Sequence, residues 1–121
     1  MDKDKKTLEN LLETIKQFNQ DRDWDQFHNP KDLAIGMVTE SAELLDLFRF
    51  VSADKLEALM ADKQEAIEEE VMDVLYFVLR FAQMNHINIY EAFERKMAKN
   101  EKKYPVESVR GKHHKYTEYK K

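Results

Sequence analysis

The stretch EEEVMDVLYFVL, residues 68–79, begins with three consecutive glutamates and continues as a run of apolar side chains interrupted by one aspartate. From Val71 to Met84 the sequence is apolar almost all round a helix, so more than one neighbouring helix must cover it. Asp73 lies inside this run, and an ionised carboxylate is expensive to bury unless a positive charge meets it. The stretch therefore predicts a central helix that carries a charged site.

The composition favours a single all-α domain. Of the 121 residues 36% are charged and only two are glycine and two proline, whereas sheets need more of these turn-forming residues. The absence of cysteine excludes disulfides and thiol chemistry. No long apolar stretch is present, and the first six residues lack the apolar core of a signal peptide. We therefore expect a cytoplasmic protein with no membrane span.

Apolar residues at helical spacing, together with cap signals, predict where the helices lie. The predicted N-caps are Thr7, Asn29, Asp62 and Asn88. The predicted helices cover residues 8–22, 30–50, 63–85 and 88–103, with a short connecting helix over 53–61. The expected fold is a four-helix bundle in one domain of residues 1–121, in which residues 106–121 form an extended basic tail.

Two pairs of acidic residues stand at helical spacing on two of these helices. Glu40 and Glu43 share a face of the second helix, and Glu70 and Asp73 share a face of the helix that carries the apolar run. Two antiparallel helices packed through these faces would bring four carboxylates together, and such a cluster is repulsive without a cation. Hard oxygen ligands at this density suit Mg²⁺, with Mn²⁺ as the second candidate. The alternative is that both pairs are solvated, as single pairs on exposed helices usually are.

Charge is unevenly spread along the chain. Residues 95–121 carry ten Lys and Arg against three Glu, whereas residues 1–94 carry ten against twenty-one acidic residues. The basic end could meet an anionic substrate beside a metal held by the acidic body, or it could be a solvated tail. The acidic body argues against nucleic-acid binding.

The spacing of the acidic pairs resembles the E-x-x-E…E-x-x-D signature of the MazG-like all-α nucleoside triphosphate pyrophosphohydrolases. Within that family the chain is most similar to the dCTP pyrophosphatase branch, over roughly residues 8–119. The segments that carry this resemblance are RDWDQFHNPKDL (22–33), ESAELLDLF (40–48), EEEVMDVLYFVL (68–79), KMAKNEKKYP (96–105) and KYTEY (115–119).

The resemblance implies Mg²⁺-dependent hydrolysis of a deoxynucleoside triphosphate, dCTP or a modified pyrimidine nucleotide, to its monophosphate and pyrophosphate, as house-cleaning of the nucleotide pool. It assigns the metal and the catalytic role to Glu40, Glu43, Glu70 and Asp73. It places the substrate among Trp24, His28, Phe50, Lys96, Asn100, Lys103, Tyr104 and Arg110.

Each assignment in the substrate site has a structural alternative. Trp24 can instead fill the core, His28 can serve only the loop, Asn100 can be a hydrogen-bonded core amide, and the lysines can be solvated. Two positions also depart from the pattern, because Phe50 stands where the relatives have a second tryptophan and Ile15 stands where they have a histidine. Ile15 removes a polar contact with the base.

Four short helices cannot cover an apolar helix on all sides, so we expect a homo-oligomer, a tetramer rather than a dimer. The competing function is a non-catalytic helical interaction module, in which the carboxylates are solvated and the apolar faces bind a partner.

Overall fold

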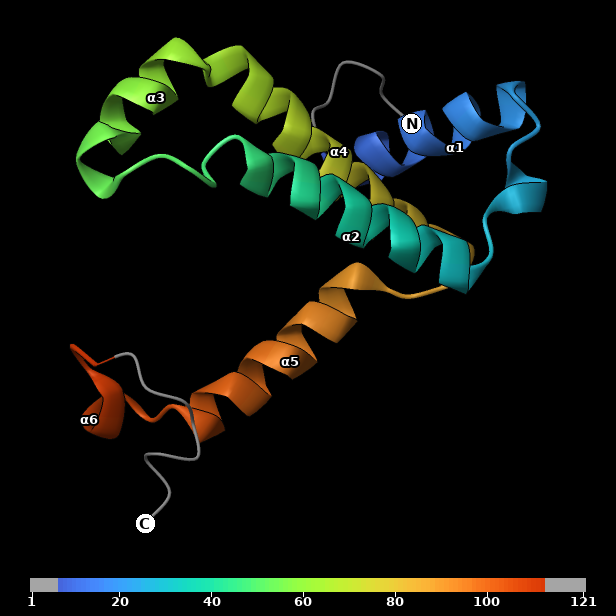
Figure 1. The fold of residues 1–121 in the computed structure, drawn as a ribbon. Helices are drawn as coiled ribbons and strands as arrows, with labels where there is room; N and C mark the ends of the chain where they lie inside the picture. The colour runs from blue at the N-terminus through green and yellow to red at the C-terminus, as the bar shows by residue number, and fades with distance from the viewer. Residues whose placement is uncertain (1–6, 113–121) are drawn as a thin grey trace. The chain divides into compact units, whose positions relative to one another are not determined.

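The computed structural model describes residues 7–112, and every regular element in that range is helical. The α-helices are α1 (Leu8–Asp21), α2 (Pro30–Asp46), α3 (Leu56–Asp62), α4 (Gln64–Met84), α5 (Ile89–Lys103) and α6 (Val106–Val109), and the 3₁₀ turns are η1 (Asp25–Phe27) and η2 (Ala53–Lys55) (Figure 1). The predicted all-α class is confirmed. None of these helices is both long and apolar enough to cross a membrane.

Three of the four predicted N-caps form as expected. The side chains of Thr7, Asn29 and Asn88 accept hydrogen bonds from the backbone N–H groups of Asn10, Asp32 and Glu91. These bonds satisfy donors that the first turn of a helix would otherwise leave unpaired. The sequence therefore locates the beginnings of α1, α2 and α5 correctly.

The predicted cap at Asp62 is wrong. Asp62 is the last residue of α3, and the backbone N–H of Lys63 still donates to the carbonyl of Leu59 at 2.8 Å. The carbonyl of Lys63 then accepts from Ile67, so this single residue closes α3 and opens α4. Asp62 consequently has a helical backbone and does not take the extended conformation that a capping residue needs.

Two other boundaries also differ from the prediction. The second helix ends at Asp46 and does not reach Phe50, because the N–H groups of Leu47 and Phe48 bond three residues back and tighten the chain into turns. The stretch from residue 106 is helical over Val106–Val109 and not extended. Residues 113–121, which hold the rest of the predicted tail and the KYTEY segment, lie outside the described residues.

The chain forms two compact units, Met1–His86 and Ile87–Lys121, and each is described by itself. In the first unit, α4 contacts α1, α2 and α3, and α2 runs antiparallel beside it (Figure 1). The buried apolar side chains of the described residues are few, namely Leu33, Ile67, Leu79 and Ala82. The second unit contains α5 and α6. The expectation that residues 1–121 make one domain stays a prediction.

The covering expected for the apolar run is incomplete in the single chain. Leu79 is buried, but Val71 is 40%, Met72 52% and Val78 45% exposed. α4 therefore buries one side against its neighbours and leaves apolar surface on another.

Candidate functional site

A close approach of α2 and α4 places the candidate site. Gly36 of α2 lies against the ring of Phe77 of α4, and a Cβ built on Gly36 would fall 2.3 Å from Cε1 of that ring. Only a residue without a side chain fits such a contact. Two turns farther along α2, Glu43 meets Glu70 of α4. The two helices therefore cross closely, in antiparallel register, on the face that carries the acidic residues.

Three glutamates converge at this crossing, and we call Glu40, Glu43 and Glu70 the acidic cluster. Each offers a carboxylate oxygen that lies within 4.8 Å of the other two. Glu40 and Glu70 are half-buried, whereas Glu43 is exposed. The predicted pairing of the two acidic faces thus occurs for these three residues.

The acidic cluster carries charge that the chain does not compensate. Burial raises the pKa of Glu40 to about 7, and the hydrogen bond and charge of Glu43 and the charges of Asp73 and Glu70 add to the increase. Burial also raises the pKa of Glu70, followed by the charges of Glu43 and Asp73. Among the described residues, the Oε2 atoms of Glu40 and Glu70 are buried with no hydrogen-bond partner. A buried acceptor without a partner is costly, so the arrangement favours a bound cation or a proton.

Asp73 lies beside the acidic cluster but not within it. Its charge acts on Glu40 and Glu70, although its carboxylate does not belong to the group of three that meet within 4.8 Å. Its side chain is exposed in the single chain, because the apolar residues around it in the sequence point to other sides of α4 or are themselves exposed. Although Asp73 lies inside the apolar run of the sequence, it is therefore not shielded from water in the single chain.

The donor set of the acidic cluster fits a divalent metal ion. Carboxylate oxygens are hard ligands, and the two buried oxygens have no hydrogen-bond partner and so can accept further bonds. Two helices fix the positions of the three side chains, so the ligands are held together before an ion arrives. The cluster can therefore bind a metal.

The loop between α1 and α2 carries Trp24 and His28. Trp24 is 42% exposed, and its ring makes a T-shaped contact with the ring of Phe18 at a centroid distance of 5.6 Å. It is thus neither buried in the core nor fully solvated, and part of its ring is accessible. His28 accepts a hydrogen bond at Nδ1 from Nε of Arg80, 2.8 Å away. Desolvation lowers the pKa of His28, and the charge of Arg80 lowers it further against an opposing effect of Asp25.

Arg80 organises a second charged group, which we call the Arg80 cluster and which also includes Asp25, His28 and Gln83. The Arg80 side chain is 1% exposed. Its guanidinium forms an ion pair with Asp25 and donates from Nη1 to Oε1 of Gln83 at 2.7 Å. Gln83 in turn donates to the carbonyl of Leu12 at 2.8 Å, which links α4 to α1.

Sequence reasoning missed the Arg80 cluster. The available signal was a lone arginine within an apolar stretch, since such a residue requires a partner when it is buried. It missed Asn19 as well, which is fully buried and accepts a hydrogen bond from the hydroxyl of Tyr76 at 2.8 Å. Partners 52 and 57 residues away in the chain, as in these two cases, leave no local pattern.

Phe50 lies in the turn that follows α2 and is 87% exposed, with the guanidinium of Arg49 at 4.9 Å from its ring centroid. The other predicted substrate residues belong to the second unit. Asn100 is half-buried and its amide contacts Sδ of Met97 at 3.8 Å, while Tyr104 is 39% exposed. Lys96, Lys103 and Arg110 are exposed.

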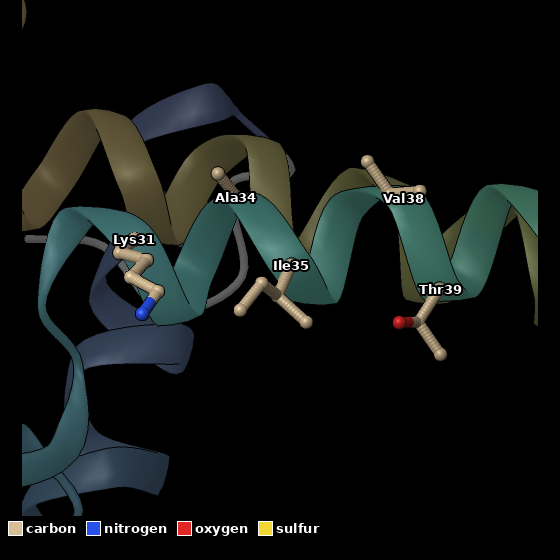
Figure 2. Close-up of a pocket in the computed structure, with 5 residues that line it drawn as sticks. All are labelled: Lys31, Ala34, Ile35, Val38 and Thr39. Carbon is tan, nitrogen blue, oxygen red and sulfur yellow. The ribbon is translucent and has the colours of Figure 1, made fainter.

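A hollow of about 380 Å³ lies on the side of α2 that faces away from α4 (Figure 2). All of its lining residues belong to α2, namely Lys31, Ala34, Ile35, Val38 and Thr39. It contains none of the predicted site residues. The acidic cluster, and not this hollow, marks the candidate site.

Comparison with known proteins supports the family resemblance seen in the sequence. Residues 35–119 match the profile of the MazG-like family. The chain is 35% identical to dCTP pyrophosphatase 1 of Mus musculus and 32% identical to that of Homo sapiens, in each case over 93% of this chain and 67% of the relative.

A solved structure has the same fold. The crystal structure of a pyrophosphatase from Archaeoglobus fulgidus matches with a TM-score of 0.77 and 39% sequence identity. The match covers 81% of this chain and 92% of the archaeal chain.

Proposed function

The chain belongs to the MazG-like family and is a nucleoside triphosphate pyrophosphohydrolase, and we propose that its substrates are pyrimidine deoxynucleoside triphosphates, dCTP or a modified form of it. The observation that carries the proposal is the acidic cluster, in which two helices hold three glutamates together with two buried oxygens unpaired. The relatives named dCTP pyrophosphatase 1 support the choice of base. The products are the monophosphate and pyrophosphate.

We propose Mg²⁺ as the metal, with Mn²⁺ as the second candidate. Glu40, Glu43 and Glu70 would hold it, and Asp73 would approach from the adjacent turn of α4. When bound, the ion supplies Lewis acidity and neutralises charge on the phosphates. One glutamate of the cluster orients or deprotonates the attacking water. A bond forms between the water oxygen and the α-phosphorus as the bond to the bridging oxygen breaks, so that pyrophosphate leaves.

Trp24 and Phe50 are the proposed contacts for the base. Stacking on an aromatic face suits a planar ring, and both side chains are partly or largely exposed in the single chain. The hydrogen bond to Arg80 occupies Nδ1 of His28, so a contact of His28 with the substrate would have to use Nε2. The residues proposed to contact the sugar and phosphates are Lys96, Asn100, Lys103, Tyr104 and Arg110.

We also propose that the protein is a homo-oligomer, a tetramer rather than a dimer. Large apolar side chains stay exposed on several helices of the single chain, including Val38 of α2 at 71% and Phe93 of α5 at 64%. Apolar surface of this kind on an otherwise charged protein is typical of association. Sedimentation of the purified protein over a range of concentrations measures the oligomeric state.

Product analysis combined with Asp73→Asn tests the proposed reaction. Wild-type protein with Mg²⁺ and dCTP should release pyrophosphate and dCMP, and Asp73→Asn should reduce turnover strongly because one negative charge beside the metal is lost. Orthophosphate and a diphosphate as first products would contradict the proposed chemistry. Near-wild-type turnover in Asp73→Asn would remove Asp73 from the site, and a non-catalytic interaction module would show no turnover at all.

A further inference from the structure

Arg80 is a buried cation whose nitrogens bond in three directions. Nε donates to His28, Nη1 donates to Gln83, and Nη2 pairs with Asp25. Two of these partners, Asp25 and His28, belong to the loop between α1 and α2. A guanidinium buried to this extent is stable only when its donors are satisfied, so the loop and α4 depend on one another here.

Apart from the bond to Arg80, η1 (Asp25–Phe27) has no hydrogen bond to α4 among the described residues. None of the residues of η1 (Asp25–Phe27) is buried, and Phe27 is 60% exposed. Its own backbone bonds, from Phe27 to the carbonyl of Trp24 and from His28 to that of Asp25, close the turn but do not attach it to α4. The Arg80 bonds at Asp25 and His28 therefore hold both ends of η1 against α4.

Trp24 immediately precedes this anchored turn. Its N–H donates to the carbonyl of Asn19 at 3.0 Å, and its ring meets Phe18, so α1 holds one side of the residue. The other side continues directly into Asp25 and the ion pair. The backbone of Trp24 is consequently held between α1 on one side and the Arg80 cluster on the other, and its ring packs against Phe18.

We propose that Arg80 is a positioning residue for base recognition, which fixes the Trp24 ring by holding Asp25 and His28 against α4. The proposal rests on the proposed function, because it assumes that the base stacks on Trp24. A guanidinium suits the role since its planar fork binds several partners at fixed angles, whereas the ammonium of lysine acts as a point charge. The residue acts through Trp24 and does not itself touch the substrate.

Trp24 reports on its own position, because it is the only tryptophan of the chain. Arg80→Met, which keeps an unbranched apolar side chain, and Asp25→Asn should each shift the Trp24 emission to longer wavelength and increase its quenching by acrylamide. The far-UV circular dichroism should stay unchanged. Arg95→Met on α5 is the matched control, since Arg95 is exposed and lies outside the cluster, and its emission should equal that of the wild type.

Kinetics with Mg²⁺ and dCTP test the consequence for the base. Stacking holds the substrate and the transition state alike, so the loss should fall on KM far more than on kcat. Trp24→Ala sets the upper limit, a decrease in kcat/KM of about 5- to 150-fold from the usual strength of base–aromatic stacking. The kcat/KM of Arg80→Met should lie between that of the wild type and that of Trp24→Ala. Arg80→Lys should recover part of the loss, because it can still pair with Asp25.

Each negative result of these experiments overturns a different step of the proposal. Unchanged emission and quenching in both Arg80→Met and Asp25→Asn would overturn the anchoring, whatever the activity. Altered emission with an unchanged KM would overturn the role in base recognition, even if wild-type protein releases pyrophosphate. A wild type that releases no pyrophosphate would overturn the proposed function while the fluorescence still decides the anchoring. If Arg80→Met does not fold, Asp25→Asn decides, since Asp25 is 44% exposed and tolerates an amide more easily.

Discussion

The acidic cluster and the Arg80 cluster both include residues of α4, and they differ in whether the chain satisfies their charges. At the acidic cluster, two carboxylate oxygens are buried with no hydrogen-bond partner. Around Arg80, each part of the guanidinium has a partner. Native proteins rarely leave buried polar atoms unpaired without a reason. A charge that the chain leaves unsatisfied therefore indicates a ligand, and one that it satisfies indicates a structural role.

The largest expected effect is stabilisation of the protein by Mg²⁺, which should depend on the acidic cluster. Saturating Mg²⁺, at about 100 times its dissociation constant, should stabilise the wild type by about 2.7 kcal/mol. Glu43→Gln should abolish most of this gain and lower kcat/KM by more than about 100-fold, since even residues behind metal ligands often cost 10- to 100-fold. Thermal melts with and without Mg²⁺ measure the first effect. Asp46→Asn, on the same helix outside the cluster, is the control. If Mg²⁺ stabilised Glu43→Gln and Asp46→Asn equally, the proposed metal site would be contradicted.

The spacing of the helices at Gly36 gives the next effect. In Gly36→Ala the new methyl group would overlap the Phe77 ring, and overpacking of this kind costs roughly 1–3 kcal/mol against about 1 kcal/mol of gained helix propensity. Forcing the helices apart should also weaken Mg²⁺ binding at the acidic cluster. Urea unfolding measures the stability. In a Phe77→Ala background the same substitution should be neutral or stabilising, and a loss of equal size in both backgrounds would rule out this contact as the cause.

Replacing a carboxylate by an amide should act with opposite sign at the two clusters. At pH 8 without metal, Glu40→Gln should leave the protein as stable as the wild type or more stable, because it relieves repulsion. Asp25→Asn should destabilise the protein by about 1 kcal/mol, because Arg80 stays buried while its charged partner, itself 44% exposed, is lost. Denaturant titrations of both variants measure the change in unfolding free energy. If both substitutions destabilised the protein, the proposed difference between the two clusters would be contradicted.

The smallest effect concerns the pH dependence of the Arg80 cluster. The pKa of His28 is lower in the folded protein than its usual value of 6.5, so the unfolded chain binds more protons in the window just below 6.5. Stability contributed by His28 should therefore be present above pH 6.5 and decrease as the pH falls through this window. His28→Asn keeps an acceptor for Arg80 but does not titrate. The difference in unfolding free energy between the two proteins should change in this window, and a constant difference would contradict the prediction.

The sequence predicted those features that depend on periodicity or on one short segment. Acidic residues at i and i+3 on two helices were enough to anticipate that Glu40, Glu43 and Glu70 meet, and the caps at Thr7, Asn29 and Asn88 follow from residue type alone. The exposure of Asp73 was not predictable in this way. The apolar pattern indicates which residues tend to avoid water, and it does not show how much of α4 a single chain covers.

The contacts that escaped prediction join distant parts of the chain. Arg80 and His28 are 52 residues apart, and Asn19 and Tyr76 are 57 apart. The close approach of α2 and α4 could not be predicted for a similar reason, because a glycine in a helix does not indicate which aromatic side chain will pack against it. Only the three-dimensional arrangement identifies Phe77 as that ring.

The register of α2 against α4 limits where the chain can change in length. The segments 36–43 and 70–77 each join one end of the close contact to the acidic cluster over the same number of residues. Deleting one residue inside either segment would turn the following part of the helix by about 100° and carry a glutamate off the shared face. Residues 47–63 connect the two helices and lie outside this register, so a change in their length would turn neither segment. Insertions and deletions in naturally occurring relatives are therefore expected to gather in that connection and to be absent from the two segments.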